Sequence, residues 1–287
     1  MCTLALAWRV FPNAPVAMVA NRDESLERPS APPTVRSDAP TRNDASTRND
    51  APTRNDASTR NDAPTIVAPR DETAGGTWIG ASDRGLVVAI TNRWLDDTRE
   101  GERSRGLLVD DCLRREGAEA AVRFVERDLD DRSYGGFTLV LADDVAAFLL
   151  AYDGRLSVTR LDPGVHVVGN VGGVINGTER FDVPERRAER GASRVESARR
   201  IAAALAPEPS ESSAVWLDRG TAVLADHEYG ACLHGDGFGT RSCTRIRTGP
   251  EAEFGFADGP PCETSMEAIE LPAAFATDGK RDEGREA

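Results

Sequence analysis

The second residue of the chain is a cysteine, Cys2, placed directly behind the initiator methionine. A small residue after Met1 favours removal of the methionine, which would leave a thiol and a free α-amino group on one residue. The ordinary α-amino pKa is about 7.7–8.0 and the ordinary thiol pKa about 8.5, so the amine can act as the base for the thiol near neutral pH. The position predicts an N-terminal nucleophile; the alternative is a small residue at an arbitrary start.

Four polar clusters follow apolar segments and offer partners to such a nucleophile. They are Asn21-Arg22-Asp23-Glu24, Gly75-Gly76-Thr77-Trp78, Thr91-Asn92-Arg93-Trp94 and Ser104-Arg105-Gly106. An arginine lowers the pKa of a neighbouring thiol, and a carboxylate holds an α-ammonium group, which are the roles expected of Arg22 and Asp23. The amide of Asn92, at a strand end, is a candidate donor to an oxyanion. The plainer alternatives are a charged turn and a turn asparagine.

The two remaining clusters are candidates for binding a substrate. Trp78 would form a wall of a pocket or fill the core, and its two preceding glycines allow another backbone to approach closely. Arg105 lies in the first turn of an expected helix, where it would bind an anionic group or remain solvated. These interpretations stay open at the level of the sequence.

The apolar pattern predicts the elements that position these clusters. Strands are expected over 3–10 and 16–21, joined by a turn at 12–15 that returns the first cluster to Cys2. Further strands are expected over 77–79, 86–91, 137–142, 145–152, 165–168, 231–234, 240–247, 253–257 and 266–271. Helices are expected over 104–115, 118–127, 185–205 and 213–224, with Ser104 as an N-cap. Helix pairs between sets of antiparallel strands predict an α+β fold of stacked sheets sandwiched by helices.

Residues 41–64 are a tandem repeat of TRNDAS and TRNDAP without a large apolar residue. Such a segment cannot offset its ordering entropy by burial. We therefore expect a single domain over 1–273, interrupted by a disordered insertion over 37–65 and followed by a disordered tail over 274–287.

Charge and composition exclude several classes of protein. A net charge of −13 argues against nucleic acid as a partner. The basic residues are arginines apart from Lys280, and an acidic, lysine-poor surface indicates a halophilic protein of a high-salt cytoplasm. No apolar run is long enough to cross a membrane, and the first residues do not resemble a signal peptide. A cytoplasmic protein without a membrane span is expected, and the oligomeric state is not indicated.

The cysteines do not form a recognisable disulfide or metal pattern. They are Cys2, Cys112, Cys232, Cys243 and Cys262, an odd number without a C-x-x-C pair. His227, Cys232 and His234 are close in sequence, but convincing third and fourth ligands are not apparent. Neither a metal site nor a cofactor is expected.

Taken in order, the clusters resemble the NRDE family, also called the transport and Golgi organisation 2 family. The resemblance runs through Met1-Cys2, Asn21-Arg22-Asp23-Glu24 with Arg28-Pro29 behind it, residues 75–80, Thr91-Asn92-Arg93 and Ser104-Arg105-Gly106. It is strong over the first hundred residues and weak over the rest. The resemblance implies the N-terminal nucleophile hydrolase fold, a four-layer α-β-β-α sandwich.

A more distant resemblance, to the penicillin V acylase and bile salt hydrolase group, implies a set of site residues. The implied catalytic residues are Cys2, Arg22, Asp23, Asn92, Asn170 and Arg241. Asn176 is the alternative to Asn170, and Arg245 is the alternative to Arg241. The residues expected to bind substrate are Asn21, Glu24, Trp78, Arg93 and Arg105.

These observations predict a Cys2-dependent hydrolase of a non-peptide amide or thioester bond in a small acyl substrate. The family resemblance implies an alternative, because animal members are linked to haem trafficking and to lipid or acyl-coenzyme A homeostasis. The alternative is a non-catalytic binding or trafficking protein for haem or an acyl lipid, with Cys2 as a soft ligand. The chain has only three histidines and no recognisable haem motif, which disfavours specific haem ligation.

Overall fold

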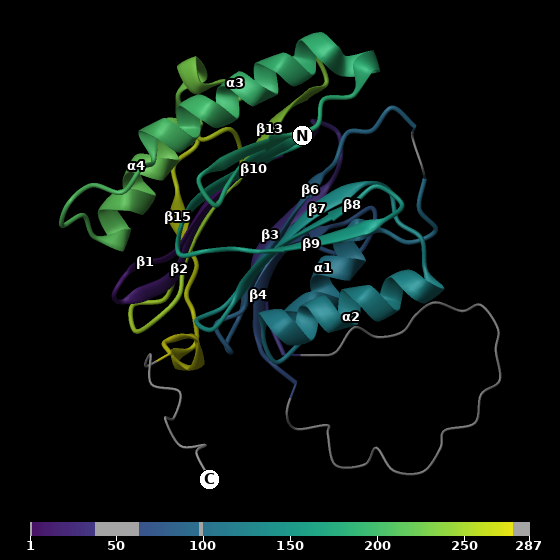
Figure 1. Cartoon of the computed structure of the whole chain (residues 1–287). Helices are drawn as coiled ribbons and strands as arrows, with labels where there is room; N and C mark the ends of the chain where they lie inside the picture. Colours follow the sequence, from purple (N-terminus) through teal and green to yellow (C-terminus); the bar gives the residue numbers. More distant parts are fainter. Residues whose placement is uncertain (1, 38–62, 98–99, 278–287) are drawn as a thin grey trace, which may run out of the picture.

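The computed structural model describes residues 2–37, 63–97 and 100–277. Two antiparallel sheets pack face to face, and a pair of helices covers the outer face of each sheet (Figure 1). Most of the expected insertion, residues 38–62, and the end of the expected tail, residues 278–287, lie outside the described residues. The four layers agree with the α-β-β-α sandwich predicted from the sequence.

The first sheet contains the first and the last strand of the described chain. Its strand order is β12-β11-β10-β1-β2-β13-β14-β15. Its strands are β1 (Cys2–Phe11), β2 (Ala14–Ser25), β10 (Gly164–Gly169), β11 (Gly172–Ile175), β12 (Thr178–Phe181), β13 (Phe238–Arg247), β14 (Glu253–Ala257) and β15 (Glu267–Ala268). Helices α3 (Ala188–Ala204) and α4 (Ser213–Ala225) lie across its outer face (Figure 1).

The second sheet is formed by consecutive strands in the order β3-β4-β5-β6-β7-β8-β9. They are β3 (Ser30–Arg36), β4 (Ile66–Asp71), β5 (Ile79–Ser82), β6 (Val87–Asn92), β7 (Phe137–Ala142), β8 (Ala147–Tyr152) and β9 (Leu156–Arg160). Helices α1 (Arg105–Leu113) and α2 (Ala118–Asp131) cover its outer face. The expected insertion separates β3 from β4, which pair at the edge of this sheet.

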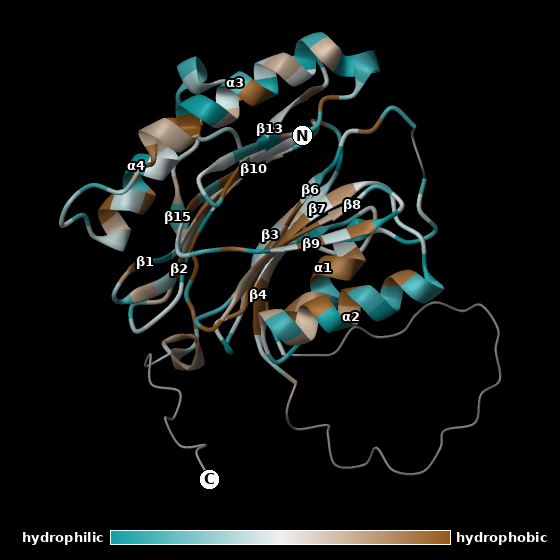
Figure 2. Ribbon diagram, in the orientation of Figure 1, coloured by the Kyte–Doolittle hydropathy of each residue, from teal (hydrophilic) through white to brown (hydrophobic). Residues whose placement is uncertain are grey.

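The alternation of side chains along β1 explains where its first residue faces. Leu4 and Leu6 belong to the core between the sheets, whereas Ala5 and Ala7 pack under α3 and α4. Successive residues of a strand point to opposite faces. Cys2 continues the row of Leu4 and Leu6, so it faces the other sheet. Figure 2 shows hydrophobic residues along the strands where the two sheets meet.

The second expected strand is longer than the sequence pattern indicates, because β2 continues through the whole Asn21-Arg22-Asp23-Glu24 cluster to Ser25. The polar cluster therefore lies inside a strand and has a fixed register, instead of ending the strand as expected. Five strands were not anticipated: β3, β4, β9, β11 and β12. The expected helix over 185–205 begins with a separate 3₁₀ turn, η1 (Glu185–Arg187), before α3.

The strand expected over 231–234 does not form. Ala231 and Cys232 are buried, as their apolar character suggests, but side chains satisfy the neighbouring backbone groups in place of a sheet ladder. The carbonyl of Ala231 accepts a hydrogen bond from Nδ2 of Asn21, and the N–H of Leu233 donates to Oγ1 of Thr240. Polar side chains on β2 and β13 thus replace a strand neighbour.

The ordered chain extends further than predicted at its C-terminal end. Ala273–Phe275 form the 3₁₀ turn η3, and Phe275 is buried in the core between the sheets. The expectation of a disordered segment beginning at residue 274 is therefore wrong for Phe275, whose aromatic ring contributes to the core. Among the helices of the described part of the chain, none is long and apolar enough to cross a membrane.

Candidate active site

An open pocket of about 760 Å³ lies where the polar clusters of the two sheets meet. It gathers most of the residues expected from the sequence. The expected residues that line it are Cys2, Arg22, Asp23, Glu24, Trp78, Asn92, Arg93 and Arg105. Asn21, Asn170 and Arg241 are not part of this lining.

The thiol of Cys2 is placed by the pairing of β1 with β2. Cys2 lies directly opposite Arg22 in the antiparallel register. Burial raises the pKa of the Cys2 thiol, and the charge of Asp23 adds to this, while Arg22 opposes it. Because burial dominates, the thiol is protonated at neutral pH and requires a base before it can attack.

The guanidinium of Arg22 is held between an aromatic ring and a carboxylate. Its central carbon lies 4.0 Å from the centre of the Trp78 ring, and its Nη2 lies 3.6 Å from Oδ2 of Asp71. Burial lowers the pKa of Arg22, although nearby Glu24, Cys2 and Asp71 favour its charged form. Asp71 was missed by sequence reasoning, because the residue comes from β4, on the far side of the repeat.

The carboxylate of Asp23 lies on the face of β2 opposite to that of Arg22. Its Oδ1 accepts a 2.6 Å hydrogen bond from Oγ1 of Thr240, the residue that pairs with it on β13. Burial raises the pKa of Asp23 to about 6, and the hydrogen bond from Thr240 works against this rise. Thr240 was also missed, since its role depends on the register between two strands more than 200 residues apart.

Asn92 ends β6 and faces the pocket from the opposite sheet. Within the described ranges its side-chain amide has no hydrogen-bond partner, so it is available to a ligand. The buried Asn170 holds the strand end in place: its Nδ2 donates a 2.6 Å hydrogen bond to the carbonyl of Asn92, and its own carbonyl accepts from the N–H of Trp94. Asn170 therefore positions Asn92 from behind and does not face the pocket.

The alternative to Asn170 lies elsewhere. Asn176 occupies a turn with a φ of 51°, where its side chain binds the backbone of Arg160 and Asp162. These contacts hold the turn between β11 and β12. Of the two candidate asparagines, only Asn170 contacts a pocket residue.

The close approach of two glycines, Gly76 and Gly106, explains how Arg105 reaches the pocket. A Cβ on Gly76 would lie 2.1 Å from the carbonyl carbon of Gly106, so the backbone before β5 presses directly against the start of α1. Ser104 caps this helix as predicted, accepting a hydrogen bond from the N–H of Gly106. Nη1 of Arg105 donates to the carbonyl of Gly136, and no carboxylate of the described chain forms an ion pair with it. Burial lowers the pKa of Arg105.

Two other charged residues at the pocket, Arg93 and Glu24, are compensated by neighbours. Nη2 of Arg93 lies 2.7 Å from Oδ2 of Asp182 and 3.8 Å from Oδ2 of Asp153. Oε1 of Glu24 accepts a hydrogen bond from the N–H of Ser25, and its Oε2 lies 4.0 Å from Nε of Arg28. Both side chains line the pocket with their charge already paired.

Asn21 and Arg241 have roles outside the pocket. The buried amide of Asn21 donates to the carbonyls of Leu224 and Ala231, and so ties the end of α4 to the first sheet. Arg241 sits at an irregularity of β13, where its guanidinium donates to the carbonyl of Leu26. Its alternative, Arg245, forms ion pairs with Asp218 and Glu253 on the surface. The geometry therefore gives neither arginine a part in the site.

Comparisons with known proteins bear on the family and the fold of the chain. The family model described as Transport and Golgi organisation 2 matches residues 1–229. No curated protein matches the chain. Penicillin V acylase from Agrobacterium tumefaciens superposes with a TM-score of 0.54 at 13% identity, covering 94% of this chain and 86% of the acylase. An N-acylethanolamine-hydrolyzing acid amidase ortholog from Caenorhabditis elegans gives 0.48 at 11% identity, covering 85% and 92%.

At this level of identity the likeness to the acylase concerns the fold. The two antiparallel sheets with helices on both outer faces are those of the N-terminal nucleophile hydrolases, so the fold predicted from the sequence is confirmed.

Proposed function

The chain belongs to the Transport and Golgi organisation 2 family, and from that premise we propose that it is a Cys2-dependent hydrolase of a non-peptide amide or thioester bond in a small acyl substrate. One observation carries the proposal. Cys2 on β1 and Asn92 on β6 belong to opposite sheets and line the same pocket, and the Asn92 amide has no hydrogen-bond partner within the described residues. The pairing of Cys2 with Arg22 adds a cation beside the thiol.

The reaction begins once Met1 has been removed. The α-amine of Cys2 takes the thiol proton, and Sγ forms a bond to the substrate carbonyl carbon, whose oxygen becomes an oxyanion. Nδ2 of Asn92 donates a hydrogen bond to that oxyanion. As the intermediate collapses, the α-ammonium returns its proton to the departing amine or thiolate, leaving the acyl group as a thioester on Cys2.

A water molecule completes the cycle. It attacks the thioester carbonyl while the α-amine takes its proton, and a second tetrahedral intermediate forms. Collapse of that intermediate releases a carboxylic acid and restores the thiol of Cys2. Arg22 favours the thiolate against the effect of burial, and the carboxylate of Asp23 holds the α-ammonium group.

The charges of the pocket support a substrate with an anionic group. Among the arginines expected to bind substrate, Arg93 is paired with two carboxylates, whereas Arg105 is stabilised by the charge of Glu24 but has no ion-pair partner in the described chain. A carboxylate or phosphate on the substrate would provide that partner. Trp78, which carries Arg22 on its ring, offers an apolar wall for an acyl chain.

A carrier for haem or an acyl chain is the alternative use of the same pocket. None of the three histidines of the chain lines it, so Cys2 would be the soft ligand offered to haem iron. This favours the hydrolase over the haem carrier. A cytoplasmic location in a high-salt cell is part of the proposal and depends on the net charge of −13.

Intact mass spectrometry tests the proposal. The purified protein is exposed to amide and thioester substrates, each made with and without a terminal carboxylate. We expect loss of Met1 and an acyl adduct on the wild type. The adduct should be absent in Cys2→Ala and retained in Cys112→Ala, which removes a buried thiol of α1. Retained Met1 would contradict the mechanism. The absence of adduct and turnover with both substrate types, together with ligand binding, would make the protein a carrier.

A further inference from the structure

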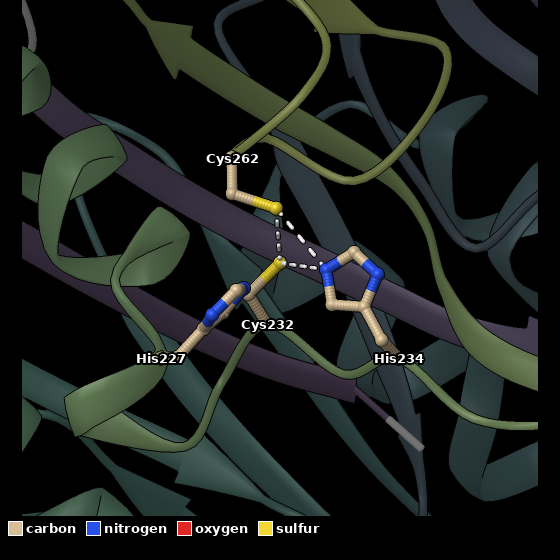
Figure 3. A group of neighbouring side chains, drawn as sticks. All are labelled: His227, Cys232, His234 and Cys262. Carbon is tan, nitrogen blue, oxygen red and sulfur yellow. Dashed lines mark hydrogen bonds between the residues drawn. The ribbon is translucent and has the colours of Figure 1, made fainter.

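A second group of reactive side chains lies outside the pocket, beyond the end of α4. His227, Cys232, His234 and Cys262 converge there, and one ligand atom from each lies within 4.8 Å of the others (Figure 3). The first three were noted in the sequence and set aside for want of a further ligand. Cys262, from the loop between β14 and β15, completes the set.

The separations within this group fit a tetrahedral metal ion. The Sγ atoms of Cys232 and Cys262 are 3.5 Å apart, and Nε2 of His234 lies 3.7 Å from the first and 3.1 Å from the second. Zinc bonds of about 2.3 Å to sulfur and 2.0–2.1 Å to nitrogen place tetrahedral ligands about 3.3–3.8 Å apart. These three distances agree with this to about 0.5 Å, and the four ligand atoms together lie within 4.8 Å of one another. The sulfur separation is also far longer than the ~2.05 Å of a disulfide.

The ring of His234 is oriented as a metal ligand is. Nε2 of His234 faces the two thiols, while its Nδ1 lies 3.9 Å from Oε1 of Glu263. A metal-bound imidazole commonly directs its second nitrogen at a carboxylate, which fixes the tautomer. The ring of His227 packs against that of His234, with ring centres 5.0 Å apart and planes at 75°.

The group stands next to the wall of the candidate active site. Cys232 lies between Ala231, whose carbonyl accepts from Asn21, and Leu233, whose N–H donates to Thr240. Thr240 in turn donates to Asp23. An ion here would tie the irregular segment after α4 to the β14–β15 loop, and so fix the segment that packs against the polar cluster of β2.

We propose that His227, Cys232, His234 and Cys262 bind one structural Zn²⁺ ion. Two thiolates and two imidazoles in tetrahedral geometry favour zinc, and four protein ligands leave no position open for substrate. Each cysteine gives up its thiol proton when the metal binds. Cys232, His234 and Cys262 lie beyond residue 229, where the family match ends. The proposal therefore does not depend on the proposed hydrolase activity.

Metal titration tests the site. The full-length protein is reduced, treated with a chelator and titrated with Co²⁺, which absorbs visible light strongly when thiolates hold it in tetrahedral geometry. We expect one equivalent of Co²⁺ to bind and to be displaced by Zn²⁺. We also expect Zn²⁺ to raise the melting temperature of the protein. Cys262→Ser removes one ligand at an exposed position, so the variant folds but loses the absorption and the thermal shift. Cys112→Ala, a buried thiol outside the group, keeps both.

Three results would overturn the proposal. The first is that the reduced wild-type protein takes up no metal. The second is that Cys262→Ser binds Co²⁺ with the same spectrum and stoichiometry as the wild type. A Cys232–Cys262 disulfide in metal-free protein isolated without reductant would identify the group as a redox pair instead. His234→Ala provides a second variant, because its side chain is partly exposed and its loss leaves the core intact.

Discussion

The hydroxyl of Thr240 donates a 2.6 Å hydrogen bond to Oδ1 of Asp23 from the directly opposite position on the neighbouring strand. The two residues are buried, and burial raises the pKa of Asp23 to about 6 while the hydrogen bond lowers it. The charge beside the proposed nucleophile is therefore governed by burial and moderated by a residue far away in the sequence, and it changes in mildly acidic solution.

This contact predicts the acidic limb of the pH–rate profile. If the Asp23 carboxylate holds the Cys2 α-ammonium, kcat/KM rises with pH through about 6. Thr240→Val removes the hydrogen bond that favours the ionised carboxylate, so the limb moves to higher pH. Thr244→Val, a buried substitution on the same strand away from Asp23, serves as the control. A limb at the same pH in both variants would exclude Asp23 as its source.

The same pKa predicts how stability depends on pH. The folded pKa of about 6 lies above the ordinary value of 3.8, so the folded protein holds a proton that the unfolded chain has lost. Its stabilising effect is complete below pH ~4 and disappears as the pH rises through ~6. Relative to Asp23→Asn, the wild type should lose on the order of 2–3 kcal/mol between these limits. Urea unfolding at several pH values measures the difference; a pH-independent difference would contradict the shift.

The sequence could predict the part of the site that depends on local pattern. Cys2 and Arg22 meet because a short turn joins two apolar strands, which fixes their register. The N-cap at Ser104 follows from residue types alone. The arrangement of stacked sheets covered by helices follows from the order of apolar strands and helices. The predicted end of the second strand was too early, because polar residues continue β2 to Ser25.

The rest depends on contacts between distant segments, which no local pattern encodes. Asp71 reaches Arg22 from across the repeat, and Thr240 reaches Asp23 from the other end of the chain. Cys262 comes from a loop 28 residues beyond His234. Arg241 was placed in the site by the resemblance to the penicillin V acylase and bile salt hydrolase group, whereas in the structure it lies at the irregularity of β13 and binds the backbone of Leu26.

Asn92 is predicted to act on the rate of chemistry more than on binding. Its amide would meet the oxyanion only in the transition state, so Asn92→Ala should lower kcat by on the order of 10²–10³ with a small change in KM. Asn170→Ala should also lower kcat, because it frees the strand end that carries Asn92. Asn13→Ala, at an exposed turn, is the control. Loss of melting temperature with an unchanged rate per folded molecule would make Asn92 a turn residue only.

Gly76 is predicted to be essential for the geometry of the pocket. In Gly76→Ala the new Cβ would lie 2.1 Å from the carbonyl carbon of Gly106, and a backbone clash cannot be relieved by a change of rotamer. We expect a loss of stability of about 1–3 kcal/mol or more, from chemical denaturation. Gly169→Ala is the matched control, since its Cβ would meet nothing closer than 3.8 Å. Equal effects of the two substitutions would show that the close approach is unimportant.

Arg105 is predicted to recognise an anionic group on the substrate. It reaches the pocket from the start of α1 and forms no ion pair within the described residues, although the charge of Glu24 acts on it, so a bound carboxylate would be its first ion-pair partner. A charged hydrogen bond contributes about 1.5–3 kcal/mol, so Arg105→Gln should raise KM by about 10- to 100-fold for substrates with a carboxylate and far less for neutral analogues. Arg93→Gln is the comparison, because Asp182 and Asp153 already neutralise that arginine. Its loss should change KM by similar factors for charged and neutral substrates. Equal KM changes for charged and neutral substrates in Arg105→Gln would show that the arginine supports the pocket wall and does not recognise the charge of the substrate.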